Sequence, residues 1–408
     1  MQGFEIAIAG CGPAGLAAAL LLARAGHHVT LFDRFPEPRP LGSGLMLQPS
    51  GMAVLAQLGL ARAVLARGAP IERLLGRSAT GRTVLDARYA DLSGPTSLGL
   101  GIHRASLFDV LYDAVRATGV TVHPDHAVAG SHTTAGGRML QFERQGDLGP
   151  FDLVIDALGL HTTLAPECGR MLPYGALWAS LPWPEGGPFD RRRLEQRYRA
   201  AREMVGVLPT GQRTGRGEEL SLFWSLRGDA HARWLDRGLE AWREEVVALW
   251  PDCAELVAQI TDPGQLTMAR YAHRALPAPA QDRLVHIGDA WHTASPQLGQ
   301  GANMALLDAM AAARAVELTR DPRAVPDMAI HLRRWHVELY QAATAFFTPL
   351  YQSDAEGPAA LRDLVFAPAS QFWPGKQVQA QIMSGLLGNP LGMLGLDRVD
   401  YAELMATA

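Results

Sequence analysis

Lysine is almost absent from this sequence: Lys376 is the single lysine, and arginine supplies nearly all of the positive side-chain charge. The formal net charge of −4 argues against a nucleic-acid-binding surface. The three cysteines show neither C-x-x-C nor zinc-ligand spacing, which indicates a reducing compartment without a disulfide framework. No uncharged apolar run reaches the roughly 18 residues of a membrane span. We therefore expect a cytoplasmic protein whose partners include neither nucleic acid nor a membrane.

What is present suits an enzyme with a large core. The chain has 408 residues, 48% of them hydrophobic, and we expect two intimately joined domains. Near the start, Gly10, Gly12 and Gly15 form G-x-G-x-x-G directly after the apolar run Ile6–Ala9, which predicts a buried parallel strand. The three glycines permit, in order, a tight turn, close approach of a pyrophosphate, and close packing of the next helix.

The helix after this turn is predicted to bind phosphate. The helix begins at Pro13, and its free N–H groups, from Ala14 onward, would face the negative charge. Asp33 follows the second strand, where a carboxylate can accept hydrogen bonds from a ribose 2′-OH. Arg34 is expected beside it, and Arg39 on the adenine or pyrophosphate side. The alternative interpretation is a tight strand–helix turn that binds no ligand.

A second motif lies far along the chain in "HIGDAWHTASPQLGQGANMALLDAMAAARAV", residues 286–316. An apolar strand ends at Gly288-Asp289, a loop carries Pro296, and a helix begins around Gly299. Together the two motifs resemble the para-hydroxybenzoate hydroxylase family, the class A FAD-dependent monooxygenases. That family carries G-D-A-x-H, then P, then G-x-G-x-N, then Asp, and the matching residues here are Gly288, Asp289, His292, Pro296, Gly299, Gly301, Asn303 and Asp308.

The resemblance covers residues 4–318 and implies the fold. It implies an α/β protein: a Rossmann-like FAD-binding domain, an inserted antiparallel β-sheet substrate domain and a helical C-terminus. We expect residues 1–172 and 272–320 to form the FAD-binding domain and residues 173–271 the substrate-binding β-layer. Residues 321–408 are expected to form the helical region.

The resemblance also implies where FAD binds. Asp289 would accept hydrogen bonds from the ribityl hydroxyls, and the start of the helix would face the flavin N1–C2=O edge. The residues implied in this role, besides those of the first motif, are Arg104, Asp289, Pro296, Gly299, Gln300, Gly301, Ala302 and Asn303. The alternatives are that Asp289 caps a helix, that the glycines form a flexible loop and that Arg104 is a surface charge.

The implied activity is oxygen transfer to an electron-rich substrate through a flavin C4a-hydroperoxide. Its partners would be a lipophilic aromatic or polyketide-like small molecule and molecular oxygen. His292 and Pro296 are candidates at the reaction centre, although His292 could instead hold the loop. The candidate substrate contacts, each of which could instead be ordinary core, are Gln48, Trp178, Phe223 and Trp224, with Met46 beside them.

One segment departs from the family pattern. The family has a D-G pair followed by Ser and Arg in the segment that serves FAD and NAD(P)H. In "DALGLHTTLAP", Leu158 stands at the position of the family's Asp, and Ala165 stands at the position of its Arg. Gly159 is kept, and Thr162 takes the place of Ser. FAD binding is still expected, whereas reduction by NADH or NADPH is in doubt and a separate flavin reductase becomes a candidate partner. The alternative activity is a flavin oxidase, dehydrogenase or reductase that inserts no oxygen.

Overall fold

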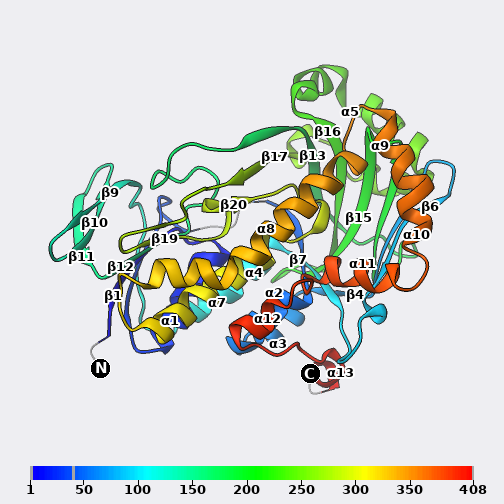
Figure 1. Cartoon of the computed structure of the whole chain (residues 1–408). Coiled ribbons are helices and arrows are strands. Elements are labelled where there is room, and N and C mark those ends of the chain that lie inside the picture. The colour runs from blue at the N-terminus through cyan, green and yellow to red at the C-terminus, as the bar shows by residue number, and fades with distance from the viewer. Residues whose placement is uncertain (1–2, 39–41, 407–408) are drawn as a thin grey trace.

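The computed structural model describes residues 3–38 and 42–406 of the chain. Figure 1 shows a parallel sheet with its helices at one end of the molecule and a large antiparallel sheet at the other, with the long helix α8 (Val325–Tyr351) running across both. The predicted α/β fold with an antiparallel layer and a helical C-terminal part is confirmed.

The parallel sheet carries the two sequence motifs. Its strands, in spatial order, are β18 (Ala280–Gln281), β19 (Leu284–His286), β12 (Leu153–Asp156), β1 (Glu5–Ala9), β2 (His28–Phe32) and β8 (Thr121–His123). All neighbours except β18 pair in parallel. The carboxyl ends of β1, β12 and β19 therefore meet at one edge, where ligands of open α/β sheets bind.

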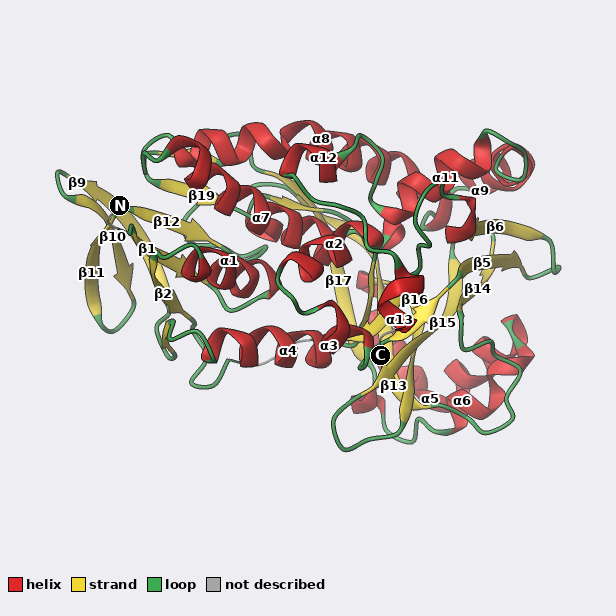
Figure 2. Ribbon diagram, turned by 90° about the horizontal axis from the view of Figure 1, so that it is seen from below, coloured by secondary structure: helices red, strands yellow, loops and turns green. Residues whose placement is uncertain are grey.

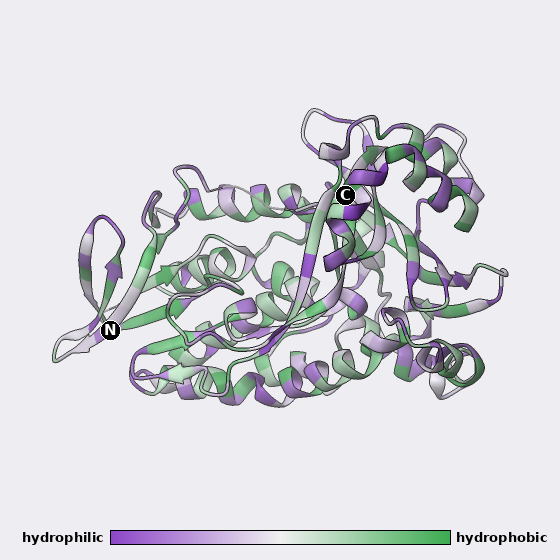
Figure 3. Ribbon diagram, turned by 90° about the horizontal axis from the view of Figure 1, so that it is seen from above, coloured by the Kyte–Doolittle hydropathy of each residue, from purple (hydrophilic) through white to green (hydrophobic). Residues whose placement is uncertain are grey.

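The two faces of this sheet have different covers because side chains alternate along each strand. Ile6 and Ile8 pack with the helices α1 (Pro13–Arg24), α4 (Arg104–Arg116), α7 (Gly301–Thr319) and α8. Ala7 and Ala9 instead pack against a three-stranded antiparallel sheet of β9 (Val128–Thr134), β10 (Gly137–Phe142) and β11 (Gly146–Phe151). Figure 2 shows the helices lying side by side, and Figure 3 shows the parallel strands largely in the hydrophobic colour.

The second sheet has eight strands and is mostly antiparallel. In spatial order they are β20 (His292–Thr293), β17 (Thr267–Ala275), β13 (Arg170–Pro182), β16 (Glu218–Arg227), β15 (Glu203–Gln212), β14 (Arg193–Arg199), β5 (Arg73–Ser78) and β6 (Thr83–Arg88). Its outer face packs against α5 (His231–Leu249) and α6 (Ala254–Ala258). Because β5 and β6 join it, this sheet includes strands that precede the expected insertion at 173–271.

Shorter elements connect the two sheets. A three-stranded sheet of β3 (Gly44–Leu47), β7 (Gly99–His103) and β4 (Ala69–Ile71) lies against β15. Residues 49–65 form two helices, α2 (Pro49–Gln57) and α3 (Ala61–Leu65), because Gly59 takes a positive φ of 68° between them.

The C-terminal region is helical, as predicted. After α8 it contains α9 (Glu356–Leu361), α10 (Ala367–Ala369), α11 (Gly375–Ser384), α12 (Pro390–Leu394) and α13 (Tyr401–Ala406). A search of the described residues finds no helix whose length and hydropathy would suit a bilayer crossing.

Candidate active site

The glycine turn after β1 leaves room for a ligand at one position and none at another. Gly10 has a φ of 108°, and a Cβ added to Gly15 would lie 2.0 Å from the carbonyl oxygen of Gly10. A Cβ at Gly12 would meet nothing within 4 Å. Gly12 is also the N-cap of α1, where no side chain caps the helix and no acidic residue lies in the first turn. The free amides and open space therefore fit an anionic group such as a pyrophosphate.

Asp33 ties this turn to the end of β2. Its carboxylate accepts hydrogen bonds from the backbone N–H groups of Cys11 (3.0 Å) and Phe35 (2.9 Å). The side chain is partly exposed, so it can accept further bonds from a ligand. Arg34 is exposed and its guanidinium lies 4.9 Å from the centre of the Phe35 ring. Arg39 lies outside the described residues.

Asp289 follows β19 at the same edge of the sheet. Its side chain is accessible to solvent, yet desolvation by the surrounding protein raises its pKa, against the opposing charges of His292 and Arg104. An accessible but desolvated carboxylate is the arrangement expected of a group that lines a recess. The neighbouring Gly288 has a φ of 58°, and its N–H donates to the carboxylate of Asp308.

The start of α7 closes this side of the recess. Gly299 has a φ of 62°, and a Cβ at Gly301 would meet nothing within 4 Å. Pro296 and Gly301 are exposed, Ala302 is half-buried, and the buried Gln300 donates to the carbonyl of Met383. The amides at the N-terminus of a 19-residue helix thus face open space, as a site for the flavin pyrimidine edge requires.

Asn303 and Asp308 of α7 hold the two loops in place. Asn303 accepts a hydrogen bond from the Gln48 N–H and donates to the carbonyls of Met46 and Gly299. Asp308 accepts from His292 Nε2 at 2.6 Å and from Arg333 Nε at 2.8 Å. Burial acts to raise the pKa of Asp308, but His292 and Arg333 outweigh it and lower the pKa to about 2.

His292 is buried in this ion pair and holds its loop, which is the alternative role that the sequence left open. Neither His292 nor Pro296 is shown to act in catalysis, and both stay predictions. Arg104 is exposed at the start of α4, and its side chain passes Gly42, where a Cβ would lie 2.9 Å from Arg104 Cδ. Its charge opposes the rise in the pKa of Asp289, so these two predicted cofactor residues lie within electrostatic range of each other.

The inner face of the eight-stranded sheet presents an aromatic wall, formed by Trp178, Phe223 and Tyr271. The rings of Trp178 and Phe223 stack with centroids 4.5 Å apart, and Trp178 Nε1 donates to the Tyr271 hydroxyl at 3.1 Å. Gly206 makes room for Phe223, because a Cβ there would lie 2.1 Å from that ring. Burial raises the pKa of Tyr271 to about 12, and the lowering effects of the Trp178 hydrogen bond and of the Arg104 charge do not cancel that rise.

Tyr271 is not among the site residues predicted from the sequence, although the sequence pattern of its strand is recognisable. Its place at the wall depends on the pairing of β17 with β13, which no local signal gives. Trp224 does not join the wall: it packs on the outer face with Trp234 and Trp242, because adjacent residues of a strand point to opposite faces. The structure therefore does not bring Trp224 together with Trp178 and Phe223.

Gln48 lies beside the start of α7, where its backbone N–H donates to Asn303. It is fully buried, and its Oε1 accepts a hydrogen bond of 2.5 Å from the Tyr89 hydroxyl. Its Nε2 has no hydrogen-bond partner and lies 3.4 Å from the position of a Cβ on Gly299. A buried donor without a partner is costly, which is consistent with a ligand or water at this position.

The segment that departs from the family pattern is held by a different acid. Asp156, at the end of β12, accepts hydrogen bonds from the N–H of Leu158, from the Thr162 hydroxyl and from His286. Asp156 and His286 are fully buried, and Leu158 and Ala165 are partly buried and apolar. The turn is thus stabilised from inside and offers no charged side chain at position 158 or 165.

Comparison with known proteins identifies the family of this chain. The sequence profile described as "FAD binding domain" matches residues 4–147 and 196–326. The chain is 29% identical over 330 residues to 6-methylpretetramide 4-monooxygenase of Streptomyces rimosus, which covers 76% of this chain and 74% of that one. It is 30% identical over 316 residues to 3-amino-4-hydroxybenzoate 2-monooxygenase of Streptomyces cremeus, with coverage of 74% and 76%.

Solved structures share the fold. The tetrameric form of 2-methyl-3-hydroxypyridine-5-carboxylic acid oxygenase superposes with a TM-score of 0.78 at 19% identity, covering 98% of this chain and 99% of that one. Klebsiella pneumoniae HpxO complexed with FAD and uric acid gives 0.78 at 20% identity, with coverage of 96% and 99%.

The fold, the two glycine turns and the relatives define an FAD-dependent oxidoreductase of the class A monooxygenase type. The chain belongs to the FAD-binding-domain family of flavoprotein monooxygenases.

Proposed function

We propose that this enzyme hydroxylates a lipophilic, planar aromatic or polyketide-like molecule with molecular oxygen. The observation that carries the proposal is the aromatic wall of Trp178, Phe223 and Tyr271 on the sheet face toward Arg104. Stacked aromatic side chains bind a flat ring through offset and edge contacts while burying much apolar area. The relatives support the same class, because their names describe monooxygenases of a pretetramide and of an aminohydroxybenzoate.

The residues present fit FAD. Open space at Gly12 and Gly301 lies at the N-termini of α1 and α7, and Asp33 and Asp289 place carboxylates beside the turns after β2 and β19. Asp289 would hold ribityl hydroxyls, and Asp33 would hold the adenosine ribose. When bound and reduced, FAD supplies the electrons that activate oxygen, which protein side chains cannot provide.

The protein then contributes binding and exclusion of water. Trp178 and Phe223 would hold the substrate ring, and Gln48 would offer an N–H to a substrate oxygen. Tyr271 stays protonated at neutral pH because its pKa is about 12, so it can donate to an oxyanion on the ring. We also propose His292 and Pro296 as candidate residues at the reaction centre. The proposed domain limits are 1–172, 173–271, 272–320 and 321–408.

The way in which the flavin obtains its electrons favours a second candidate activity. Because Leu158 and Ala165 offer no charge for a nicotinamide cofactor, we infer that the flavin is reduced by a separate flavin reductase or by the substrate itself. Reduction by the substrate would make the enzyme a flavin oxidase or dehydrogenase that inserts no oxygen. The mass of the product separates the two activities.

Substitution of the wall tests the substrate class. Trp178→Leu removes the stacking partner of Phe223 and should raise KM for an aromatic substrate about tenfold, since such stacking contributes roughly 0.5–1.5 kcal/mol beyond area burial. Leu226→Ala, at the half-buried end of β16 on the outer face, is the matched control that should leave KM unchanged. Equal KM values in wild type and Trp178→Leu would remove the wall from the substrate site.

A further inference from the structure

Arg274 of β17 joins two turns that face the cofactor site. Its Nε donates to the carbonyl of Ala290 at 3.1 Å, and its Nη1 donates to the carbonyl of Leu160 at 3.0 Å. Ala290 belongs to the turn after β19, next to Asp289, and Leu160 belongs to the turn after β12. One guanidinium from the substrate sheet thus ties together two turns of the parallel sheet.

The surroundings of Arg274 are shaped for this bridge. The side chain is 3% exposed, and a Cβ at Gly169 would lie 3.0 Å from its Cα. Gln341 of α8 donates to the carbonyls of both Arg274 and Thr293, the residue paired with it on β20. The backbone of Arg274 is therefore fixed on one side while its side chain reaches the turns on the other.

The charge of Arg274 has no carboxylate partner among the residues that the structure describes, and its Nη2 has no hydrogen-bond partner. Its two hydrogen bonds to the turns support the fold, but burying the positive charge without a carboxylate partner is unfavourable. Arg333 of α8, by contrast, is equally buried but is paired with Asp308 at 2.8 Å. An uncompensated positive charge beside these turns favours an anionic ligand.

We propose that Arg274 is a positioning residue for FAD, which sets the spacing of the turns after β12 and β19 and adds positive potential beside them. The inference rests on the proposed flavin site and deepens it. A residue of the eight-stranded sheet would then directly position the turns after β12 and β19 beside the cofactor. The arginines of the run 191–193 are different, because they pair with Glu218, Glu72 and Asp190 on the surface.

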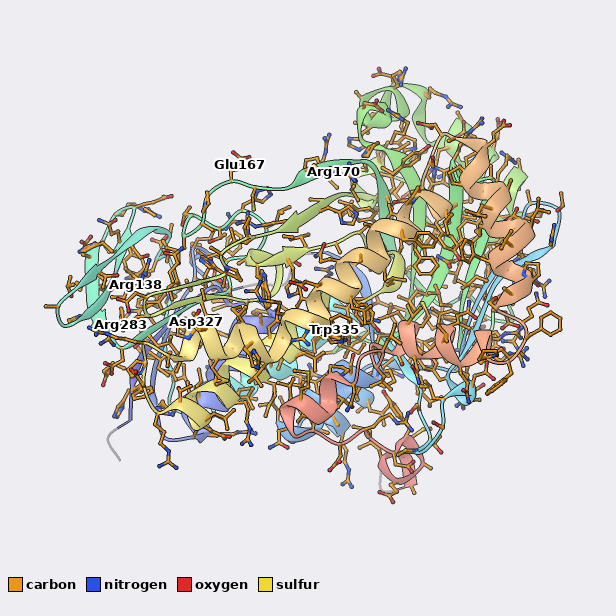
Figure 4. All side chains as sticks on the ribbon, in the orientation of Figure 1. Arg138, Glu167, Arg170, Arg283, Asp327 and Trp335 are labelled. Atoms are coloured by element: carbon orange, nitrogen blue, oxygen red, sulfur yellow. The ribbon has the colours of Figure 1, made fainter. Side chains whose placement is uncertain are left out.

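Arg138 provides a matched control. It is 7% exposed, has no carboxylate ion pair among the described residues and donates to the carbonyl of Asp282, to Gln281 and to Ser131. It supports the turn that precedes β19, at the opposite end of that strand from Asp289. Figure 4 shows Arg138 and Arg283 beside the three-stranded sheet, at the end of the molecule far from the eight-stranded sheet.

The test compares Arg274→Met with Arg138→Met in the full chain. Both should lower the melting temperature of the flavin-free protein to a similar extent. Only Arg274→Met should weaken FAD binding, by tenfold or more in titration, and speed hydrogen exchange at residues 158–162 and 288–292. Arg274→Lys keeps the charge but cannot reach both carbonyls, so it should be intermediate.

FAD affinity within threefold of wild type in Arg274→Met, or equal loss of affinity in both methionine variants, would overturn the proposal. If a methionine variant does not fold, Arg274→Lys and Arg138→Lys are judged by the same criterion. Wild-type protein that binds no FAD would instead refute the proposed function, and the two failures are therefore distinguishable.

Discussion

Asp289 lies in the turn after β19, where desolvation by the surrounding protein raises its pKa. Asp289→Ala removes the acceptors proposed for the ribityl hydroxyls and should cost about 1–3 kcal/mol of FAD binding. Purified variant should therefore contain less flavin than wild type by absorbance. Asp282→Ala, an exposed acid on the turn before β19, is the control and should retain full flavin content. Equal flavin in wild type and Asp289→Ala would remove Asp289 from the site.

His336 gives the protein a predictable sensitivity to acid. Its Nδ1 accepts from Arg333 at 2.8 Å and its Nε2 donates to Gly385, while burial and the Arg333 charge lower its pKa from 6.5 to about 3. Below pH 6.5 the unfolded chain binds a proton at this histidine that the folded protein does not bind, so stability falls as pH falls.

The expected loss from His336 is about 1.4 kcal/mol per pH unit between pH 6.5 and 3. His336→Gln preserves a donor and an acceptor but does not titrate. Urea unfolding at about pH 7 and about pH 5 should show a smaller drop for the variant than for wild type. The same drop in both proteins would place the acid sensitivity elsewhere.

Two glycines in the turn between β1 and α1 allow effects on ligand binding and on folding to be measured separately. Gly12→Ala adds a methyl group to open space, whereas Gly15→Ala places one against the carbonyl oxygen of Gly10. Gly12→Ala should leave the flavin-free protein as stable as wild type but lower its FAD affinity, because the methyl group occupies the phosphate cradle. Gly15→Ala should lower the melting temperature. Thermal unfolding with and without FAD measures both, and normal FAD binding by Gly12→Ala would place the phosphates elsewhere.

Elements with strong local signals could be predicted from the sequence. The glycine turn, the strands around it and the hairpin of β9 and β10 follow from spacing and turn residues. The placement of β5 and β6 in the eight-stranded sheet could not be predicted, because it depends on pairing with β14, which lies far along the chain. For the same reason no local signal distinguishes Phe223 from Trp224 or identifies Tyr271 and Arg274 as site residues.

For the whole molecule, the absence of charged side chains at positions 158 and 165 affects how the flavin is reduced. Charge-assisted hydrogen bonds to the phosphates and ribose of a nicotinamide cofactor contribute about 1.5–3 kcal/mol each. Two such losses weaken docking by about a hundredfold or more. Asp156 does not replace them, because it is fully buried and its carboxylate is occupied by Thr162, His286 and the Leu158 N–H.

We therefore expect slow reduction of the bound flavin by NADH or NADPH in anaerobic stopped-flow experiments, with and without substrate. Added flavin reductase should restore turnover. The double variant Leu158→Asp with Ala165→Arg restores both charges. Its flavin should be bleached faster by a nicotinamide cofactor than the flavin of the wild type. Rapid, saturable bleaching of the wild-type flavin by either cofactor would show that other residues dock it.

Oxygen insertion is the central claim, and the source of the new atom in the product tests it most directly. Extracts of cells that express the wild-type protein or the Gly12→Ala variant would be compared by mass spectrometry under a heavy isotope of oxygen gas. We predict a planar aromatic product, found with the wild type alone, that has gained one oxygen atom carrying the heavy isotope. A product that has only lost two hydrogens, or whose new oxygen is unlabelled, would contradict it.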